Sequence, residues 1–366
     1  MSSTSEVYPD FVYKVRLHPF LHQVSGSNFM FKFDSSTLCK PLVEKEYSFY
    51  KLLPNSLKEF TPKYKGSIEM QMEEQVDGTI HYYGVVPHSQ LALLGLPNCG
   101  SDSHYARLGY SSNKAHIIDY FDEDDLRLKR SGSIEIDRSS LECYDDPNTK
   151  LAAGKRLNQR TANDVQSDAA HKFILLENLV SNYNMPSVLD LKMGTRTHGE
   201  DDNEEKRLRK QQRCDISTSK SLGLRIHGMQ KYNLQNKKFE TLTKHQALEF
   251  TDHQFKEQVL NFIHTHAASV QSLAKPICDK LSQFYQCVSQ QDTMRFYSSS
   301  LLIMYDGAPD ATQANTVDVR AVDFAHAEYD PTQSHNTGTG PDVGYLQGIQ
   351  TLIDIFSEVG VMDDLT

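Results

Sequence analysis

The sequence predicts an α+β protein with two lobes, and three features of its pattern lead to this prediction. The first 86 residues form short, partly alternating segments bounded by turn formers, which is typical of strands. Residues 87–168 are polar, with few apolar anchors. Residues 169–366 are mainly helical in pattern, with some further strands. A chain of 366 residues is long enough for two lobes that each bury a core.

The N-terminal lobe, residues 1–86, is expected to be mainly β with one helix. Apolar residues at helical spacing begin at Val43, and Pro54 is expected to end the first helical segment. The last two strands of the lobe would flank a turn at Asp77-Gly78. The strands are expected at Phe11 to Leu17, Asn28 to Phe33, Thr37 to Leu42, Ser67 to Gln71 and Thr79 to Val86.

Residues 87–168 are expected to form a flexible insertion. The segment is rich in Ser, Asn, Asp and Arg and contains the acidic run Asp122 to Asp125. Such a composition buries too little apolar surface to offset the entropy of ordering the chain. Any protein partner is expected to bind through this insertion.

Charge and cysteine content limit the partners and the location of the protein. The net charge of −10 and the pI of about 5.8 argue against binding of nucleic acid or an anionic membrane through the overall field, so an anionic ligand needs a local basic patch. The six cysteines are scattered without a CxxC pair, which is typical of reduced intracellular thiols and not of zinc. With no signal core and no transmembrane window, we expect no membrane insertion and a cytoplasmic and/or nuclear location.

The stretch from Pro186 to Gly194 carries the clearest chemical signal. Asp190 and Lys192 lie two residues apart, so on an extended segment both side chains emerge on the same face. A carboxylate there could orient or deprotonate an alcohol, while an ammonium group neutralises phosphate. On pattern alone, a surface Asp/Lys pair beside a turn at Gly194 is the more common interpretation.

This stretch resembles the PxxxDxKxG signature of the inositol phosphate kinase family. Further segments follow in the family's order: Ser299 to Leu302 is similar to its SSLL segment, Asp323 to His326 to its DFAH segment, and Gly340 to Gly348 to its glycine-bearing tail. Four ordered matches indicate the family much more strongly than one.

Within the family, the sequence is most similar to the inositol hexakisphosphate kinases. The segments that carry this likeness are Pro19 to Val24, Leu191 to Gly199 and Ser217 to Gln230. The sequence departs from the usual pattern at Ser187, where family members usually have Cys, and at Ser25, where they usually have a second Gly.

The resemblance implies a two-lobed fold related to protein kinases, with ATP and Mg²⁺ bound between a small sheet-rich N-lobe and a larger mixed C-lobe. It implies that Asp190 and Lys192 are catalytic, with Asp190 orienting the acceptor. Lys40, Glu177, Leu179 and Asp323 would hold ATP, the second and third through backbone groups at a hinge. Asp323 and Ser300 would hold the metal ion, since hard oxygen donors suit it. By analogy with protein kinases, Glu46 could pair with Lys40.

Two of these residues also have simpler interpretations. Lys40 could be an ordinary lysine of an edge strand. Asp323, at a strand end, could be a turn former.

Residues Asp201 to Arg213 predict a helix with acidic residues in its first turn and basic residues later, as the helix dipole favours. A solvated surface helix is the simple interpretation. However, Lys206, Arg209, Lys210 and Arg213 recur at intervals of three and four and would form one cationic stripe that can hold inositol phosphates. The resemblance singles out Arg213 and Gln230 as substrate contacts. The patch is short and lacks interleaved aromatics, so direct nucleic-acid binding is not expected.

The expected reaction converts inositol hexakisphosphate to a diphosphoinositol with ATP as the phosphoryl donor. Two alternatives remain open from the sequence. One is a polyphosphate multikinase or a trisphosphate 3-kinase that acts on a free hydroxyl. The other is a non-catalytic interaction protein on the same fold, which the joint presence of Lys40, Asp190, Lys192 and Asp323 argues against.

Overall fold

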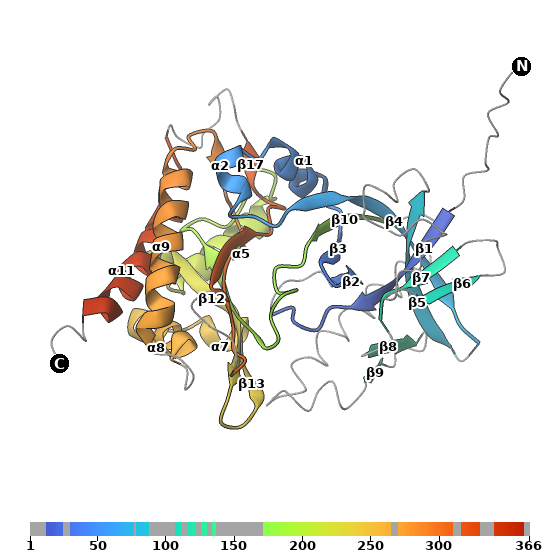
Figure 1. Ribbon diagram of the computed structural model, residues 1–366. Coiled ribbons are helices and arrows are strands. Elements are labelled where there is room, and N and C mark those ends of the chain that lie inside the picture. Colours follow the sequence, from blue (N-terminus) through green and yellow to red (C-terminus); the bar gives the residue numbers. More distant parts are fainter. Residues whose placement is uncertain are drawn as a thin grey trace, which may run out of the picture.

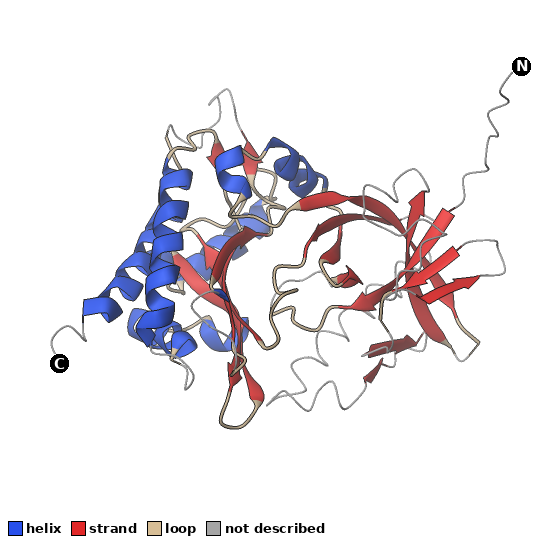
Figure 2. Ribbon diagram, viewed as in Figure 1, coloured by secondary structure: helices blue, strands red, loops and turns tan. Residues whose placement is uncertain are grey.

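The computed structural model shows two lobes that lie side by side (Figure 1). A sheet dominates the N-terminal lobe, whereas helices cover one face of a second sheet in the C-terminal lobe (Figure 2). The structure describes residues 12–24, 30–76, 78–87, 107–110, 116–121, 126–129, 134–136, 171–264, 270–309, 316–329 and 340–361. The predicted two-lobed α+β fold is confirmed.

Six strands of the N-terminal lobe close into a ring, because β1 pairs with both β2 and β5. Val15, Phe33 and Leu175 are buried in the core of this lobe. Ring closure leaves these strands without a long free edge. In ring order the strands are β1 (Val12–Pro19), β2 (Phe31–Asp34), β3 (Thr37–Pro41), β10 (His171–Glu177), β4 (Tyr64–Glu74) and β5 (Thr79–Pro87).

The described part of segment 87–168 is not a loose insertion but extends the N-terminal sheet. Strand β7 pairs in parallel with β1, and its Ile118 is completely buried in the core of the lobe. The sequence pattern missed these strands because each has only three or four residues and depends on the edge of an existing strand. They are β6 (Arg107–Tyr110), β7 (His116–Asp119), β8 (Leu126–Lys129) and β9 (Ile134–Ile136). The rest of the expected insertion, including Asp122 to Asp125, lies outside the described residues.

Strand β10 also differs from expectation, because it belongs to the N-terminal lobe. Its apolar run Phe173 to Leu176 predicts a buried strand, and the strand is buried between β3 and β4. Periodicity does not say which sheet such a strand joins. The first lobe therefore extends through Glu177, and the second begins after it and not at residue 169.

The C-terminal lobe is built on an antiparallel sheet in the order β13-β12-β11-β15-β16. Its central strand β11 is buried along its whole length, as is typical of a strand covered on both faces. The strands are β11 (Pro186–Met193), β12 (Leu224–Asn233), β13 (Lys238–Thr243), β15 (Ser300–Asp306) and β16 (Asp318–Val322). A small pair, β14 (Met294–Arg295) and β17 (Glu328–Tyr329), lies beside it.

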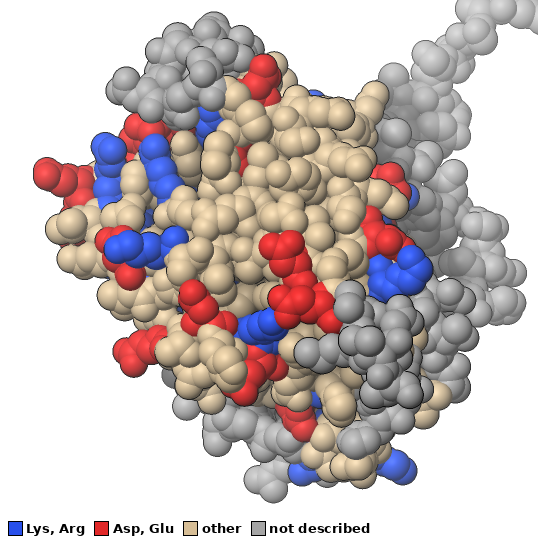
Figure 3. Space-filling model, turned by 90° about the vertical axis from the view of Figure 1, so that its left-hand side faces the viewer, with Lys and Arg blue, Asp and Glu red and all other residues tan. Residues whose placement is uncertain are grey.

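Helices α8 (Asp252–Ile263), α9 (Val270–Ser289) and α11 (Val343–Val361) cover the sheet face that points away from the N-terminal lobe (Figure 1). Acidic and basic side chains are interspersed on this side of the molecule (Figure 3). None of the described helices combines the length and apolarity needed to cross a membrane. The remaining helices are α1 (Glu44–Leu52), α2 (Asn55–Lys58), α5 (Glu204–Asp215), α6 (Ser219–Leu222) and α7 (Lys244–Ala247).

The glycine-bearing tail is explained by close packing at the start of α11. A Cβ atom on Gly348 would lie 2.5 Å from the carbonyl oxygen of Gly223, which is much closer than real contacts allow. Gly223 itself has a φ of 76°, a left-handed conformation that favours glycine. The two glycines let α11 pack directly against the turn that precedes β12.

Candidate active site

A cavity of about 340 Å³ lies between the two lobes. Leu38 and Lys40 line it from the N-terminal sheet, and Val188, Asp190 and Lys192 line it from β11 of the C-terminal sheet. The face of the second sheet that helices α8, α9 and α11 do not cover therefore forms one wall, and the ring of the first lobe forms the other.

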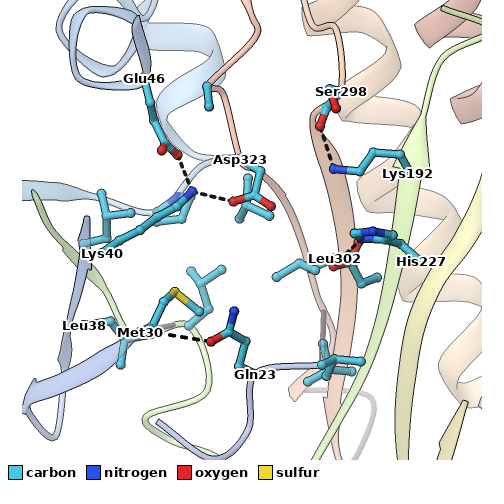
Figure 4. A pocket seen from close by; sticks show the side chains of 18 of the residues that line it. Gln23, Met30, Leu38, Lys40, Glu46, Lys192, His227, Ser298, Leu302 and Asp323 are labelled. Carbon is cyan, nitrogen blue, oxygen red and sulfur yellow. Dashed lines mark hydrogen bonds and ion pairs between the residues drawn. The ribbon is translucent and has the colours of Figure 1, made fainter. Parts of the chain in front are cut away.

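Lys40 lies at the centre of an ion-pair cluster that joins the lobes. Its Nζ donates to Glu46 Oε1 at 2.8 Å and to Asp323 Oδ1 at 2.5 Å (Figure 4). Burial alone would lower the pKa of Lys40, but the two carboxylates outweigh it and raise the pKa above its ordinary value. The Lys40–Glu46 pairing is confirmed. Lys40 is not on an edge, because β3 lies between β2 and β10.

Asp323 follows β16, as its sequence position predicts, and adopts a left-handed φ of 65°. Its side chain keeps 34% exposure toward the cavity. Burial would raise the pKa of this carboxyl, but Lys40 and Lys192 hold the pKa well below its usual range. Asp323 is therefore an ionised oxygen donor in an unusual backbone conformation, which fits a functional site better than an ordinary turn.

Several buried oxygens lie near Asp323, either on the strand paired with β16 or within electrostatic reach of its carboxylate. In the part of the chain that the structure describes, Ser300 Oγ, Glu46 Oε2 and Tyr50 OH are buried without a hydrogen-bond partner. Ser300 is paired with Val322, the residue before Asp323, and with Lys192 on β11. Ser300 does not line the cavity, although its two strand partners do.

These oxygens suit a hard divalent cation such as Mg²⁺. The described residues hold no cluster of three or more His, Cys, Asp or Glu side chains arranged for a metal ion. An ion at Asp323 would therefore have few protein ligands and would depend on oxygens from a phosphate-bearing ligand, which is common for Mg²⁺.

Asp190 and Lys192 both point into the cavity, which confirms that they share one face of β11. Both are buried, so the surface-pair interpretation is wrong. Lys192 Nζ donates to the carbonyl oxygen of Ser298 at 2.6 Å (Figure 4). Burial lowers the pKa of Lys192, while Asp323 and Asp190 oppose this shift. A buried ammonium group held in this way is prepared to meet an anion.

The segment between the lobes combines backbone polar groups with an apolar slot. Glu177 and Leu179 line the cavity there, together with apolar side chains such as Val188 and Met304. The backbone N–H of Glu177 already donates to the carbonyl oxygen of Lys63 at 2.9 Å. Any ligand contact of the Glu177 backbone would therefore use its carbonyl oxygen.

Helix α5 forms where it was expected, with Asn203 capping its first turn through the N–H of Lys206. Only the C-terminal part of the predicted stripe reaches the cavity, through Lys210 and Arg213. Lys206 and Arg209 are exposed and do not line the cavity, which corrects the expectation of a four-residue cradle. Helical spacing places residues on one side of a helix, but it does not say where a neighbouring cavity ends.

Gln230 does not reach the cavity either. It is 1% exposed, and its Nε2 lies 3.0 Å from the carbonyl oxygen of Pro186 and 3.2 Å from His22 Nδ1. His22 belongs to the segment after β1, so this contact joins the two lobes. In this structure Gln230 has a structural position, in place of the expected phosphate contact.

Sequence reasoning missed several basic residues that line the cavity. They are Arg225, His227, Lys244 and His326. His227 Nδ1 lies 3.7 Å from Asp190 Oδ2, and Lys210 Nζ lies 3.4 Å from His326 Nε2. Arg225 and His227 alternate along β12, which was the available signal for two of them.

Comparison with known proteins agrees with this geometry. Residues 173–357, about half of the chain, match the family model described as inositol polyphosphate kinase. This chain belongs to the inositol polyphosphate kinase family. The matched region of this kinase includes β11 with Asp190 and Lys192, helix α5, β15 and Asp323.

The kinase is also similar to curated relatives over nearly its whole length. It is 35% identical to inositol hexakisphosphate kinase 3 of Mus musculus, over 94% of this chain and 95% of the relative. It is 32% identical to inositol hexakisphosphate kinase 2 of Homo sapiens, with the same coverage. A crystal structure of inositol phosphate multikinase Ipk2 from S. cerevisiae with ADP and Mn²⁺ aligns with a TM-score of 0.46 at 26% identity, over 51% of this chain and 84% of that chain.

Proposed function

We propose that this protein is an inositol hexakisphosphate kinase, which transfers the γ-phosphoryl group of ATP to a phosphate of inositol hexakisphosphate and forms a diphosphoinositol. One observation carries the proposal: the Lys40–Asp323 pair faces Asp190 and Lys192 across one cavity between the lobes. Phosphoryl transfer depends mainly on positioning and on neutralising charge, and this arrangement supplies groups for both substrates. The similarity to inositol hexakisphosphate kinases supports the choice of acceptor.

On the donor side, the adenine base would occupy the apolar slot beside the segment between the lobes. The carbonyl of Glu177 can accept from the adenine amino group, and the N–H of Leu179 can donate to a ring nitrogen. Lys40, which remains charged, would contact the α- and β-phosphates of ATP. Its present partner Asp323 would then be released to the metal ion.

Asp323 and Ser300 are the protein residues that we assign to Mg²⁺. The side-chain oxygens of both residues are the kind of ligand that Mg²⁺ prefers. Among the described residues, Ser300 Oγ is buried without a hydrogen-bond partner. Bound Mg²⁺ neutralises negative charge on the transferring phosphates. The left-handed backbone conformation of Asp323 holds its carboxylate at the end of β16, where the carboxylate can bind the metal ion together with Ser300.

On the acceptor side, a highly phosphorylated inositol needs several cations, and this acidic chain gathers them around the cavity. Lys192, Lys210 and Arg213 line it, and the structure adds Arg225 and Lys244. Charge-assisted contacts to phosphate are the stronger kind of hydrogen bond. Asp190 would orient the acceptor group toward the γ-phosphorus.

We further propose a cytoplasmic and/or nuclear location, which the scattered cysteines favour. Protein partners are proposed at residues 87–168. Direct binding of nucleic acid is not proposed, because the basic patch of α5 is short and lacks interleaved aromatic residues.

The test is turnover of a panel of inositol phosphates by the purified chain with ATP and Mg²⁺. The panel runs from trisphosphates to inositol hexakisphosphate, and products are assigned by mass and ring-position NMR. We expect inositol hexakisphosphate to gain one phosphoryl group. Turnover of only those acceptors that have a free hydroxyl would instead indicate a multikinase or a trisphosphate kinase, and no turnover of any acceptor would indicate a non-catalytic role.

A further inference from the structure

His227 lies at an irregularity in the pairing of β11 with β12. Asp190 is opposite Gly228 and the next residue, Leu191, is opposite Ile226, so β12 carries one extra residue, His227, at this point. Bulges of this kind redirect a side chain and are frequent next to active sites. Gly228, the next residue, lies opposite Asp190 and has no side chain that would compete with His227 for space.

His227 lies beside the acceptor residues. His227 lines the cavity, its side chain is 15% exposed, and Nδ1 lies 3.7 Å from Asp190 Oδ2. Figure 4 shows it next to Lys192, on the opposite side of the cavity from Lys40. Catalytic hydrogen bonds are often longer in ligand-free structures than in complexes.

The protonation of this imidazole follows from its neighbours. The charged groups that line the cavity with it include the cations Lys192 on β11, Lys244 on α7 and Arg225 on β12 and the anions Asp190 and Asp323. Further charged residues line the same cavity: Lys40, Lys210, Arg213, Glu46 and Glu177. Burial lowers the pKa of His227, and Lys192 and Lys244 lower it further against the attraction of Asp190. A carboxylate only accepts, so the nitrogen facing Asp190 carries the proton and Nε2 is left as an acceptor.

We propose that Asp190 and His227 form a catalytic dyad in which Nε2 of His227 takes the proton of the acceptor. This inference rests on the proposed function. The acceptor oxygen forms a bond to the γ-phosphorus, the bond from that phosphorus to the bridging oxygen breaks, and ADP leaves. The proton of the acceptor oxygen moves to Nε2 and later to solvent. Asp190 orients the acceptor, as proposed above, and also holds the ring of His227 and stabilises the imidazolium.

The dyad predicts a specific pH dependence. A phosphate monoester holds its last proton with a pKa of about 6. In the wild type, His227 can take the last proton of a singly protonated acceptor phosphate, so this form of the acceptor still reacts. The decrease of kcat on the acid side of the pH profile therefore begins below the pKa of the acceptor phosphate. In His227→Gln the acceptor must lose its proton to solvent first. Its kcat should therefore fall by about tenfold for each pH unit below about 6, at pH values where the wild-type rate is still level.

The experiment compares the pH profiles of kcat for wild type, His227→Gln and His227→Asn with inositol hexakisphosphate. His253→Gln is the matched control, because its side chain is 81% exposed on α8. We expect both His227 variants to shift the acid limb to higher pH and His253→Gln to match wild type. If the wild type is active and the pH profiles of kcat of the folded His227 variants superimpose on its profile, the dyad is overturned and the proposed function is not. Inactive wild type on the whole panel would overturn the proposed function and the dyad together.

A second measurement does not depend on activity. The ¹⁵N chemical shifts of the wild-type imidazole, assigned by their absence in His227→Gln, report the tautomer. We expect the proton on Nδ1 in wild type and its loss from that position in Asp190→Asn. A proton on Nε2 in wild type would contradict the dyad.

Discussion

Asp323 is the residue on which most of the proposed chemistry converges. It contacts Lys40, follows the strand that pairs with Ser300, and stays ionised. Replacing it with Asn keeps the size of the side chain but removes the charge that would hold Mg²⁺. We expect Asp323→Asn to lose several kcal/mol of transition-state stabilisation, which is a fall of at least about a hundredfold in kcat. Turnover and thermal unfolding should be measured together, and a folded variant with wild-type turnover would remove Asp323 from the mechanism.

The acceptor contacts can be separated from the donor contacts by residue. Lys192→Ala or Arg213→Ala should raise the KM for inositol hexakisphosphate far more than the KM for ATP. Each lost charge-assisted contact costs about 1.5–3 kcal/mol, or a factor of roughly 10 to 150. Lys40→Ala should show the opposite bias.

Arg209→Ala is the matched control for Arg213→Ala, because both arginines lie on α5 but only Arg213 lines the cavity. We expect its kinetic constants to stay close to wild type. If Arg209→Ala weakens acceptor binding as much as Arg213→Ala, the helix acts as a diffuse positive field.

Residue-level prediction from the sequence succeeded where strand periodicity was regular. Asp190 and Lys192 share a face because side chains alternate along β11. His227 was missed although it alternates with Arg225 along β12, because the sequence does not say that β12 pairs with β11 beside the cavity. Lys206 and Arg209 were misplaced because helical spacing carries no information on the position of the other lobe.

At the level of elements, the added strands of segment 87–168 make the clearest prediction. Ile118 on β7 is completely buried, whereas its neighbour Ile117 is half-buried. Truncating a buried Ile to Ala costs about 2–5 kcal/mol. We expect Ile118→Ala to lower the denaturant midpoint clearly and Ile117→Ala to change it much less. Equal and small effects would show that β7 is not part of the folded core.

Strands and helices were predicted correctly where their own residues carried the signal. The prediction failed where the place of a strand depends on the other strands with which it pairs. The helix expected at Asp201 to Arg213 from its charge pattern formed as α5 (Glu204–Asp215). The extended segment expected around Asp190 and Lys192 formed as β11. Strand β10 was found but assigned to the wrong lobe, and β6 to β9 were missed. Short strands have too few residues for a period of two to be distinguished from chance.

For the whole molecule, the two substrates should stabilise the fold independently of turnover. Both would bind only the assembled cavity, so each should raise Tm by mass action, with about 2.7 kcal/mol expected at a concentration of 100 Kd. Thermal shift assays with ATP·Mg²⁺ and with inositol hexakisphosphate would measure this. Lys40→Ala should lose the ATP shift and keep the acceptor shift. Loss of both shifts would mean that Lys40 supports the fold and does not contact the nucleotide.

The central claim is that the acceptor atom is an oxygen of an existing phosphate, and ³¹P NMR of the product tests it most directly. The purified chain is incubated with ATP, Mg²⁺ and inositol hexakisphosphate, with Asp323→Asn as the control. We predict new phosphoanhydride resonances on the inositol product of the wild type and none with the variant. If the wild type leaves inositol hexakisphosphate unchanged, or forms only monoesters from less phosphorylated inositols, the claim is contradicted.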